Sequence, residues 1–394
     1  MTTASAPGFE LRGGETWRDP FPMYAALRDR DPVHYAAWGD FYVLSRFADV
    51  WAAARDSATF SSAGGLTIAY GEVEATGLGE AVPMVFLDPP EHTAFRRRVT
   101  ARLTPRKAAE IEPDVRRFVV ERIEKLRAMG EADIVSELFG PLPSFVVAHY
   151  LGVPVADRPL FDRWTEAIVQ AAAGGDPRTA GDPFAELLAY FAARVERSRS
   201  QPGDDMISAL ARLGEERVST ARILGFAFTM VTGGNDTVTG LLSGASCLLT
   251  RHRDQRAKLL DDPGRIPNAV EELLRLTSPV QNLARTATRD VELHGVSIPA
   301  GKKALLCYAA ANRDDREYGP TAETFDVERR ISKILSFSYG THYCIGASVA
   351  RLQARVVLEE LLARCPDFAV DVEGGRYAAG SYVRRHKSLP WIAR

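Results

Sequence analysis

Cysteine is scarce in this chain, and its spacing excludes the small structural classes that depend on it. Only four cysteines occur among 394 residues, and no two of them stand in a C-x-x-C pair. A disulfide framework or a zinc ribbon needs clustered cysteines. We therefore expect a protein of a reducing compartment, the cytoplasm. The four cysteines are Cys247, Cys307, Cys344 and Cys365.

An excess of charge of either sign is also absent. The 49 Lys and Arg residues stand against 51 Asp and Glu, which leaves a net charge of -2. A bulk attraction to nucleic acid or to an anionic membrane requires a strongly basic chain. Neither is therefore expected as a partner, and a partner recognised by charge must use a local patch.

Targeting signals, repeats and low-complexity tracts are lacking as well. The N-terminus has no basic start followed by an apolar block, so neither a secretory signal nor a membrane anchor is predicted. No internal repeat or Pro/Gly-rich linker divides the chain. Hydrophobic residues make up 46% and charged residues 25%, as in an ordinary folded protein. The sequence thus favours one large domain over residues 1–394, although the length also permits more than one.

The longest apolar run tests this interpretation. Between Ile223 and Thr250 the only ionised side chain is Asp236, and the run is long enough to cross a bilayer. Polar Asn235, Asp236 and Thr237 occupy its middle, where a membrane-spanning helix has the highest cost for polar groups. A helix buried in protein is favoured, and a transmembrane helix is the alternative.

Hydrophobic periodicity predicts a mainly α fold with a small β portion. The stretch from Ser61 to Pro90 is a long loop, and a loop of this length suggests a binding function. Helices are expected over 21–28, 48–55, 104–130, 157–172, 183–199, 204–213, 219–250 and 346–364, with two shorter ones between 255 and 277. Strands are expected at 41–45, as an antiparallel set at 291–293, 296–299 and 304–308, and in the tail 368–394.

The most specific pattern lies directly before the last predicted helix. Residues 337–346 read Phe-Ser-Tyr-Gly-Thr-His-Tyr-Cys-Ile-Gly, which is F-x-x-G-x-H-x-C-x-G. This segment resembles the haem-binding loop of the cytochrome P450 family, in its soluble bacterial type. Further motifs follow in the family's order, so the resemblance covers nearly the whole chain. It departs at Ser338, where glycine is frequent, and at Ile334 and Val238.

The resemblance implies that Cys344 is the thiolate ligand of a haem iron and that His342 contacts a haem propionate. A thiolate is the ligand form, so the cysteine needs a lowered pKa, to which the positive end of the helix at Gly346 contributes. Gly340 and Gly346 would let the backbone approach a flat macrocycle. The alternative is that Cys344 is a small buried apolar residue, the usual role of a lone cysteine.

A second motif lies in the middle of the long apolar helix. Residues 233–237, Gly-Gly-Asn-Asp-Thr, resemble the family's oxygen-activation motif. Each glycine weakens a helix by about 1 kcal/mol relative to alanine, so an opened groove over the haem would explain the pair. The resemblance implies that Thr237 hydrogen-bonds dioxygen and that Asp236 relays protons. The alternative is that two helices meet here, with Asp236 as the N-cap of the second.

A third motif is Glu272-Leu-Leu-Arg275, which matches the family's E-x-x-R pair. The i,i+3 spacing puts both charges on one helical face. The resemblance implies a buried pair joined by Arg329, a structural trio that holds the cysteine loop. The same spacing occurs in three further pairs that we interpret as solvated surface pairs: Glu15/Arg18, Glu124/Arg127 and Glu196/Arg199.

A fourth motif is His92-Thr-x-x-Arg96-Arg97, in which His92 and Arg96 share one helical face. The resemblance assigns these two residues and Arg285 to the haem propionates, and an arginine–carboxylate contact is strong and directional. The alternative is a basic, solvated helix face. A docking face for an electron donor is suggested by Arg96, Arg97, Arg98, Arg102 and Lys107.

Together these motifs imply a cytochrome P450 fold with haem b (heme, iron protoporphyrin IX) between a central long helix and the helix after the cysteine loop. The implied activity is a monooxygenase that inserts one oxygen atom from O2 into a lipophilic small molecule. The chain shows no Rossmann fingerprint or flavin region, so a separate ferredoxin and ferredoxin reductase would supply electrons from NAD(P)H. Substrate-pocket residues are predicted to be Leu66, Ile68, Phe86, Phe226, Met230, Gly233, Val280, Asn282, Leu283 and Tyr382.

Two other classes remain open. A haem-thiolate sensor or carrier would bind ligands without turnover, although Asp236 and Thr237 argue against it because a sensor needs no proton relay. A haem-free helical binding protein would purify without colour. For each pocket residue, ordinary core packing is an equally good explanation.

Overall fold

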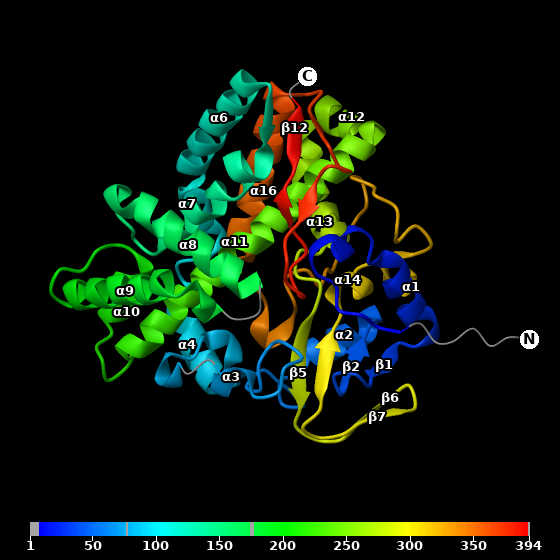
Figure 1. Ribbon diagram of the computed structural model, residues 1–394, viewed down its shortest axis with the longest axis horizontal. Coiled ribbons are helices and arrows are strands. Elements are labelled where there is room, and N and C mark those ends of the chain that lie inside the picture. Colours follow the sequence, from blue (N-terminus) through cyan, green and yellow to red (C-terminus); the bar gives the residue numbers. More distant parts are fainter. Residues whose placement is uncertain (1–7, 76–77, 174–176, 393–394) are drawn as a thin grey trace, which may run out of the picture.

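The computed structural model describes residues 8–75, 78–173 and 177–392, and helices dominate it (Figure 1). Strands form a smaller part, so the predicted fold class is confirmed. The helices are α1 (Phe21–Arg30), α2 (Phe47–Arg55), α3 (Glu72–Ala75), α4 (Glu91–Thr100), α5 (Pro105–Glu110), α6 (Glu112–Met129), α7 (Pro141–Tyr150), α8 (Arg158–Ala173), α9 (Asp182–Ser200), α10 (Met206–Ala211), α11 (Thr220–Arg251), α12 (Arg253–Asp261), α13 (Ile266–Thr277), α14 (Tyr308–Ala311), α15 (Asp315–Tyr318) and α16 (Ala347–Arg364).

Strands gather mainly on the side of the molecule where α1 and α2 lie (Figure 1). Five of them form one sheet in the order β1-β2-β8-β5-β3, in which β2 and β8 run parallel and the other neighbours antiparallel. The strands are β1 (Val33–Ala36), β2 (Phe41–Leu44), β3 (Phe60–Ser61), β4 (Glu131–Asp133), β5 (Leu283–Ala287), β6 (Val291–Leu293), β7 (Val296–Ile298), β8 (Lys303–Leu306), β9 (Ala369–Val370), β10 (Arg376–Tyr377), β11 (His386–Ser388) and β12 (Pro390–Ile392).

The prediction of one antiparallel set over 291–308 is wrong for its last strand. β6 and β7 form a separate hairpin, whereas β8 lies between β2 and β5 in the large sheet. All four residues of β8 are buried, as are those of β2, so both strands need neighbours that cover them. The residues of β6 and β7 remain partly exposed apart from Ile298, and a two-stranded hairpin suffices for them.

The single helix predicted over 104–130 is also wrong, since α5 and α6 are separate. Thr104 caps α5, and its Oγ1 accepts a hydrogen bond from the Lys107 N–H at 3.3 Å. Pro113 lies in the first turn of α6, where its missing N–H costs nothing. In a continuous helix this proline would remove an interior hydrogen bond and clash with the preceding turn. The chain therefore starts a new helix at Glu112.

The long apolar run forms α11, which crosses the middle of the molecule (Figure 1). Its neighbours include α7, α8, α9, α13 and α16, and most of its side chains are buried among them. Ser219 caps its start by accepting a hydrogen bond from the Arg222 N–H at 3.2 Å. Within the described part of the chain, no helix is long and apolar enough to cross a membrane. The transmembrane alternative therefore has no support.

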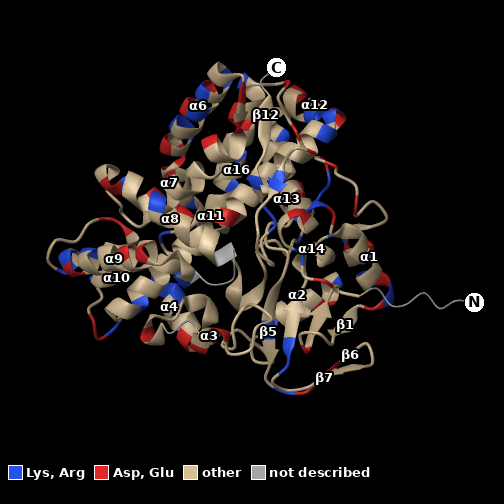
Figure 2. Ribbon diagram, in the orientation of Figure 1, with Lys and Arg blue, Asp and Glu red and all other residues tan. Residues whose placement is uncertain are grey.

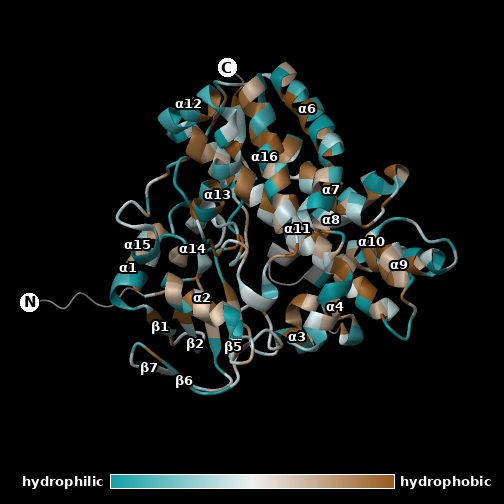
Figure 3. Ribbon diagram, turned by 180° about the vertical axis from the view of Figure 1, so that it is seen from behind, coloured by the Kyte–Doolittle hydropathy of each residue, from teal (hydrophilic) through white to brown (hydrophobic). Residues whose placement is uncertain are grey.

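Charged residues lie mainly on the peripheral helices. Helices such as α6 and α12 carry basic and acidic side chains along their lengths (Figure 2). Seen from behind, the same two helices show hydrophilic stretches facing outward (Figure 3). Buried apolar residues from α6, α7, α11, α13 and α16 form one large core cluster. This packing fixes α11, which carries the acid-threonine motif, and α16, which directly follows the cysteine motif.

Candidate functional site

Cys344 lies on the turn that leads into α16. Its N–H donates to the Phe337 carbonyl at 2.9 Å, which closes the loop upon itself. Gly346 is the N-cap residue of α16, and its N–H lies close enough to the sulfur to act as a donor. Among the four cysteines, all of which are free, Cys344 is exposed and the others are buried. The alternative of a small buried apolar residue is therefore wrong.

The expected lowering of the thiol pKa is not what the protein atoms alone produce. The surrounding protein removes water from the charged form and thereby raises the pKa of the Cys344 thiol. The Gly346 N–H and the guanidinium groups of Arg96 and Arg351 act in the opposite direction. The Gly346 N–H at the start of α16 thus acts against the effect of burial, in the direction expected for a helix N-terminus.

Gly340 serves close packing of the cysteine loop. Its φ is 68°, and a Cβ built on it would lie 2.8 Å from the Ala54 carbonyl oxygen and 2.9 Å from the Arg55 Cα. The nearest obstacle is thus the backbone at the end of α2. Ser338, two residues earlier, also has positive φ, 56°. This left-handed conformation explains why a glycine would suit position 338.

Replacing Gly340 by alanine should destabilise the protein by more than backbone strain alone. Gly214 offers a matched control, since its φ is 83° and nothing lies within 4 Å of a built Cβ. We expect Gly214→Ala to cost about 1–2 kcal/mol from the left-handed conformation. Gly340→Ala should cost clearly more, because its Cβ also meets backbone that cannot move aside. Urea denaturation measures both, and equal losses would contradict the role assigned to close packing.

Asp236 and Thr237 lie in the middle of α11, and the helix is continuous through them. The alternative of two helices meeting at Asp236 is therefore wrong. The Thr237 Oγ1 donates to the Gly233 carbonyl at 3.0 Å, one turn earlier. Gly233 itself is exposed, although the helix around it is mostly buried. The backbone at Gly233 is therefore accessible, and Thr237, one turn later, is partly accessible.

Arg385 is a residue of this site that sequence reasoning missed. Its Nε lies 2.6 Å from the Asp236 Oδ1, and the two side chains are only 11% and 14% exposed. Burial raises the pKa of Asp236 to about 6, and the Arg385 charge and hydrogen bond act against that rise. In the sequence, Asp236 is a single acid within an apolar helix, and no nearby residue indicates a partner for it. The segment that brings Arg385 to it lies about 150 residues later in the chain.

Four basic side chains converge beside the cysteine loop. The ring centroids of His92 and His342 are 4.3 Å apart, and Arg96 Nη2 donates to the Tyr343 carbonyl at 2.5 Å. Burial and the charges of Arg285, His92 and Arg96 lower the pKa of His342 to about 2. His92, Arg96, Arg285 and His342 thus lie near one another, as the motifs predicted.

Within the described part of the chain, no carboxylate forms an ion pair with the two arginines of this cluster, although the charge of Asp88 acts on His92. Among the described residues, none of the four basic groups forms an ion pair. His92 is fully buried, and neither of its ring nitrogens has a hydrogen-bond partner there. Burial and the Arg96 charge lower the pKa of His92 to about 4. A buried, unpartnered imidazole beside two arginines suits an anionic group that accepts hydrogen bonds.

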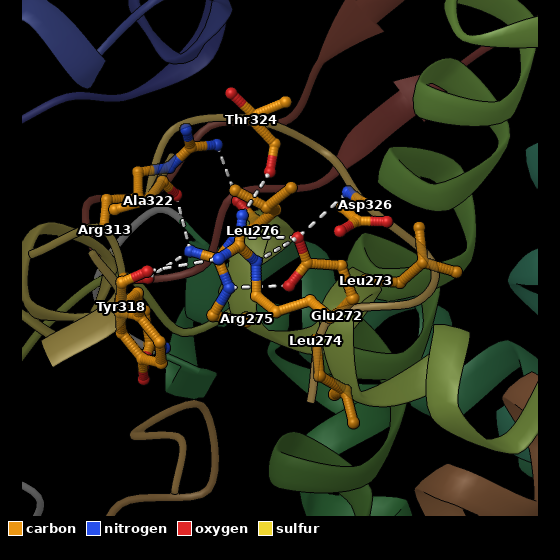
Figure 4. A network of polar contacts seen from close by, with 12 residues as sticks. Glu272, Leu273, Leu274, Arg275, Leu276, Arg313, Tyr318, Ala322, Thr324 and Asp326 are labelled. Atoms are coloured by element: carbon orange, nitrogen blue, oxygen red, sulfur yellow. Dashed lines mark hydrogen bonds and ion pairs between the residues drawn. The ribbon is translucent and has the colours of Figure 1, made fainter. Parts of the chain in front are cut away.

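The E-x-x-R pair is fully buried and forms part of a larger network (Figure 4). Arg275 Nε and Nη2 bind the two Glu272 oxygens at 2.7 and 2.8 Å, and Arg275 Nη1 donates to the carbonyls of Asn312 and Ala322. Arg329 Nε donates to Glu272 Oε1 at 3.2 Å. The structure thus brings together the three residues of the predicted trio. They tie α13 to the irregular segment before the cysteine loop.

The three pairs interpreted above as solvated do lie on the surface. Arg127 Nη1 lies 2.8 Å from Glu124 Oε2, and both side chains are more than 40% exposed. The pairs Glu15/Arg18 and Glu196/Arg199 are likewise formed and partly exposed. Position in the fold, and not spacing, separates the buried pair from these.

The predicted pocket residues do not all have the same environment. Met230 and Gly233 are accessible on α11. Phe226, one turn before Met230, is buried, and its ring packs edge-to-face against that of Phe95 with the ring centroids 6.0 Å apart. Asn282 is buried, and its Nδ2 donates to the Ser381 carbonyl at 3.1 Å. Ile68 packs against the core cluster around Phe41. Partly exposed side chains are those of Leu66, Ile68, Phe86, Met230, Val280, Leu283 and Tyr382.

A cavity of about 380 Å³ lies elsewhere, beside the C-terminal half of α11. Gly244, Cys247 and Thr277 contribute to its wall, and no predicted pocket residue does. Three of its four arginines have acidic partners, as Arg313 has in Glu323, and the fourth, Arg384, donates to the Trp17 carbonyl and the Tyr377 hydroxyl. Nothing about this cavity therefore connects it with the cysteine loop.

Comparison with known proteins matches the site to one family. The family model described as cytochrome P450 matches residues 265–372, which include the buried trio and the cysteine loop. Cytochrome P450 130 of Mycobacterium tuberculosis (strain ATCC 25618 / H37Rv) is 56% identical over 401 residues, covering 99% of each chain. The chain belongs to the cytochrome P450 family.

Other members of the cytochrome P450 family agree in sequence and fold. Vitamin D(3) 25-hydroxylase of Pseudonocardia autotrophica is 34% identical and covers 94% of this chain and 93% of its own. The structure of cytochrome P450 CYP109Q5 from Chondromyces apiculatus superposes with a TM-score of 0.87 at 32% identity, covering 96% of both chains. The resemblance seen in the motifs is thereby confirmed. This cytochrome P450 is a monooxygenase, and its family implies a haem cofactor.

The residues present fit a haem. A porphyrin with two carboxylates supplies the anionic groups that the cluster around His92 lacks. The exposed Cys344 sulfur next to this cluster offers an axial ligand. Among the described residues, no group of three His, Cys, Asp or Glu side chains could hold a metal ion by itself.

Proposed function

We propose that this cytochrome P450 binds haem b through Cys344 and anchors its propionates on His92, Arg96, Arg285 and His342. The observation that carries the proposal is a cluster of two arginines without an ion-pair partner among the described residues and two histidines, beside an exposed cysteine. The fully buried His92, with both nitrogens unpaired, is its clearest single element. The buried trio takes no part in the chemistry and stabilises the segment that leads into the cysteine loop; its members are Glu272, Arg275 and Arg329.

When bound, the haem supplies the activation of O2 and the insertion of one oxygen atom into the substrate. The chain supplies positioning and protons. Thr237 Oγ1, which donates to the Gly233 carbonyl here, turns to donate toward the ligand side when a reacting group needs its proton. Asp236, the residue before Thr237 on α11, takes up a proton from water and passes it to this hydroxyl. The raised pKa of Asp236, about 6, suits a group that both gains and loses a proton near neutral pH.

The substrate is a lipophilic small molecule. Leu66, Met230, Val280 and Leu283 are apolar and partly exposed, which supports an apolar pocket. A relative whose name states that it hydroxylates vitamin D(3) acts on a molecule of this kind. Binding is tested by spectral titration with a library of neutral natural products, steroids and fatty compounds. Absence of a spectral shift with every compound would contradict this substrate class.

The electrons come from a ferredoxin and its reductase, which draw on NAD(P)H. Arg97 and Arg98 on α4 are exposed, and no ion pair engages them among the described residues. Arg102 and Lys107 are partly engaged by Asp204 and Glu110. These basic side chains, together with Arg96 near the cysteine loop, are the docking face we propose for an acidic ferredoxin. The whole chain acts as one catalytic domain in the cytoplasm.

Thr237→Ala should separate a monooxygenase from a haem-thiolate sensor. In turnover with a surrogate ferredoxin and its reductase, we expect product formed per electron to fall by about tenfold or more, because the proton donor is lost. Electron consumption itself should continue. Thr232→Ala is the matched control, since Thr232 Oγ1 makes the same bond to Phe228, one turn back, at 3.0 Å. A sensor would show no substrate-dependent product in either variant or in the wild type.

A further inference from the structure

The segment from Tyr382 to Arg385 packs directly against α11. The Arg384 N–H donates to the Pro279 carbonyl at 2.8 Å, and the Gln281 N–H donates to the Tyr382 carbonyl at 2.7 Å. A Cβ built on Gly240 would lie 2.7 Å from the Arg384 carbonyl oxygen and 3.4 Å from the Arg385 Cβ. Gly240 follows Asp236 by one helical turn. The absence of a side chain there lets this segment reach the acid.

Arg384 and Arg385 have different partners although they are adjacent. Arg384 Nε donates to the Trp17 carbonyl at 2.7 Å, and its Nη2 donates to the Tyr377 hydroxyl at 2.8 Å. Arg385 instead pairs with Asp236, with Nε and Oδ1 2.6 Å apart. One arginine thus anchors the tail to the N-terminal region, and the other faces the motif of α11.

The Asp236–Arg385 pair is shielded from solvent, so it is not a typical surface pair. Exposed ion pairs contribute little, whereas removing one partner of a buried pair leaves an uncompensated charge. The charged or titratable groups that act on Asp236 from the tail are Arg385 and Tyr382. Burial, followed by the Asp236 charge, raises the pKa of Tyr382 to about 12. Tyr382 therefore stays neutral, and Arg385 alone offers compensating positive charge.

We propose that Arg385 is a positioning residue that holds Asp236 as a charged, hydrogen-bonded carboxylate and thereby governs when this acid takes up and releases a proton. This inference rests on the proposed proton-relay role of Asp236. When the guanidinium moves away, Asp236 accepts one proton from water. When Asp236 has given that proton to the Thr237 hydroxyl chain, the carboxylate pairs with Arg385 again. One proton enters and one leaves, and Arg385 stays protonated throughout.

Tyr382 adds a link to the substrate. It is a predicted pocket residue, and it lies three residues before Arg385 on the same short segment. The isolated bridge between Val280 and Val383 joins this segment to another part of the predicted pocket. A substrate that contacts Tyr382 or Val280 therefore acts on the backbone that carries Arg385.

The direct test is an infrared pH titration of the Asp236 carboxyl, on the apoprotein and on the haem-loaded protein. Asp236→Asn identifies the band by removing it. Arg385→Gln should raise the pKa of Asp236 by about 1–3 units, because burial then acts without an opposing cation. Arg385→Lys should restore part of the wild-type value. Arg384→Gln is the matched control, and we expect it to leave the titration unchanged.

The second readout is the pH dependence of product formed per electron. Its midpoint should shift to higher pH in Arg385→Gln by the same amount as the carboxyl titration. In the Asp236→Asn background, Arg385→Gln should have no further effect. An unchanged titration in Arg385→Gln, or an equal shift in Arg384→Gln, would overturn the proposal.

Two further outcomes are informative. If Arg385→Gln does not fold, Arg385→Lys decides the question, since a titration identical to wild type would overturn the proposal and an upward shift would support it. The apoprotein titration needs no haem. A failure of the haem-thiolate assignment therefore appears in the spectrum of the loaded protein, separately from the result for Arg385.

Discussion

Replacing Cys344 by histidine should abolish the spectrum that a thiolate-ligated haem shows when it is reduced under carbon monoxide. The thiolate donates electron density that an imidazole does not, and this donation also favours O–O cleavage. Substrate oxidation should therefore disappear together with the spectral signature. The Cys344 side chain is exposed and not part of the core, so the larger imidazole should leave the fold largely intact. Absorption and circular dichroism spectra check both expectations.

Cys365→Ser is the control for the cysteine experiment. Cys365 is buried at the opposite end of α16 from Cys344, and its thiol lies outside the basic cluster. This variant should keep the thiolate signature and the activity. A Cys344→His protein that retains the signature would disprove ligation by Cys344. If only Cys365→Ser lost the signature, the ligand would be Cys365, and the assignment to Cys344 would be wrong.

Replacing Arg275 by leucine should lower the free energy of unfolding by about 3–5 kcal/mol, because it leaves the buried Glu272 charge with too few partners. Arg275 makes bonds to both Glu272 oxygens and to the carbonyls of Asn312 and Ala322, and its guanidinium lies 4.8 Å from the centre of the Tyr318 ring. All of these contacts lie in the network of Figure 4 or beside it. Urea denaturation of the loaded protein measures the loss.

Haem retention gives a second measure of the Arg275 variant. The network fixes the segment from Asn312 to Arg329, which leads into the cysteine loop. We expect Arg275→Leu to release haem more readily than the wild type. Arg127→Ala is the control, since it breaks a pair of the same i,i+3 spacing on the surface. It should change neither stability nor haem retention measurably, and equal losses in the two variants would contradict the structural role of burial.

Local sequence patterns predicted the elements whose signals are short-range. The central helix, α16 and the helices of the middle region appear close to their predicted bounds, because their apolar residues recur at helical spacing. α7 was missed because most of its ten residues are buried on all sides, so no amphipathic period exists. The break between α5 and α6 is caused locally by Pro113. It was missed because the periodic apolar residues on both sides predicted one continuous helix.

The residues of the candidate site also fall into two groups, those located by local motifs and those that only the packing revealed. The motifs located Cys344, Asp236, Thr237 and His92 because each lies in a short, specific pattern. Nothing in the sequence connected Arg385 with Asp236, since the two lie on segments that meet only through the packing of the tail on Gly240. The reason for Gly340 was also hidden, because its neighbour is the end of α2.

The sequence by itself determined the family, the helical class and the identity of the sulfur, acid and hydroxyl groups available for chemistry. These depend on residue type and on spacing within one element, which the linear order contains. The tertiary structure alone decided which charges are buried, which basic groups gather without a counter-ion, and which arginine faces the acid of α11. Burial and long-range pairing depend on how distant segments pack, and packing sets both the local dielectric and the partners of each charge.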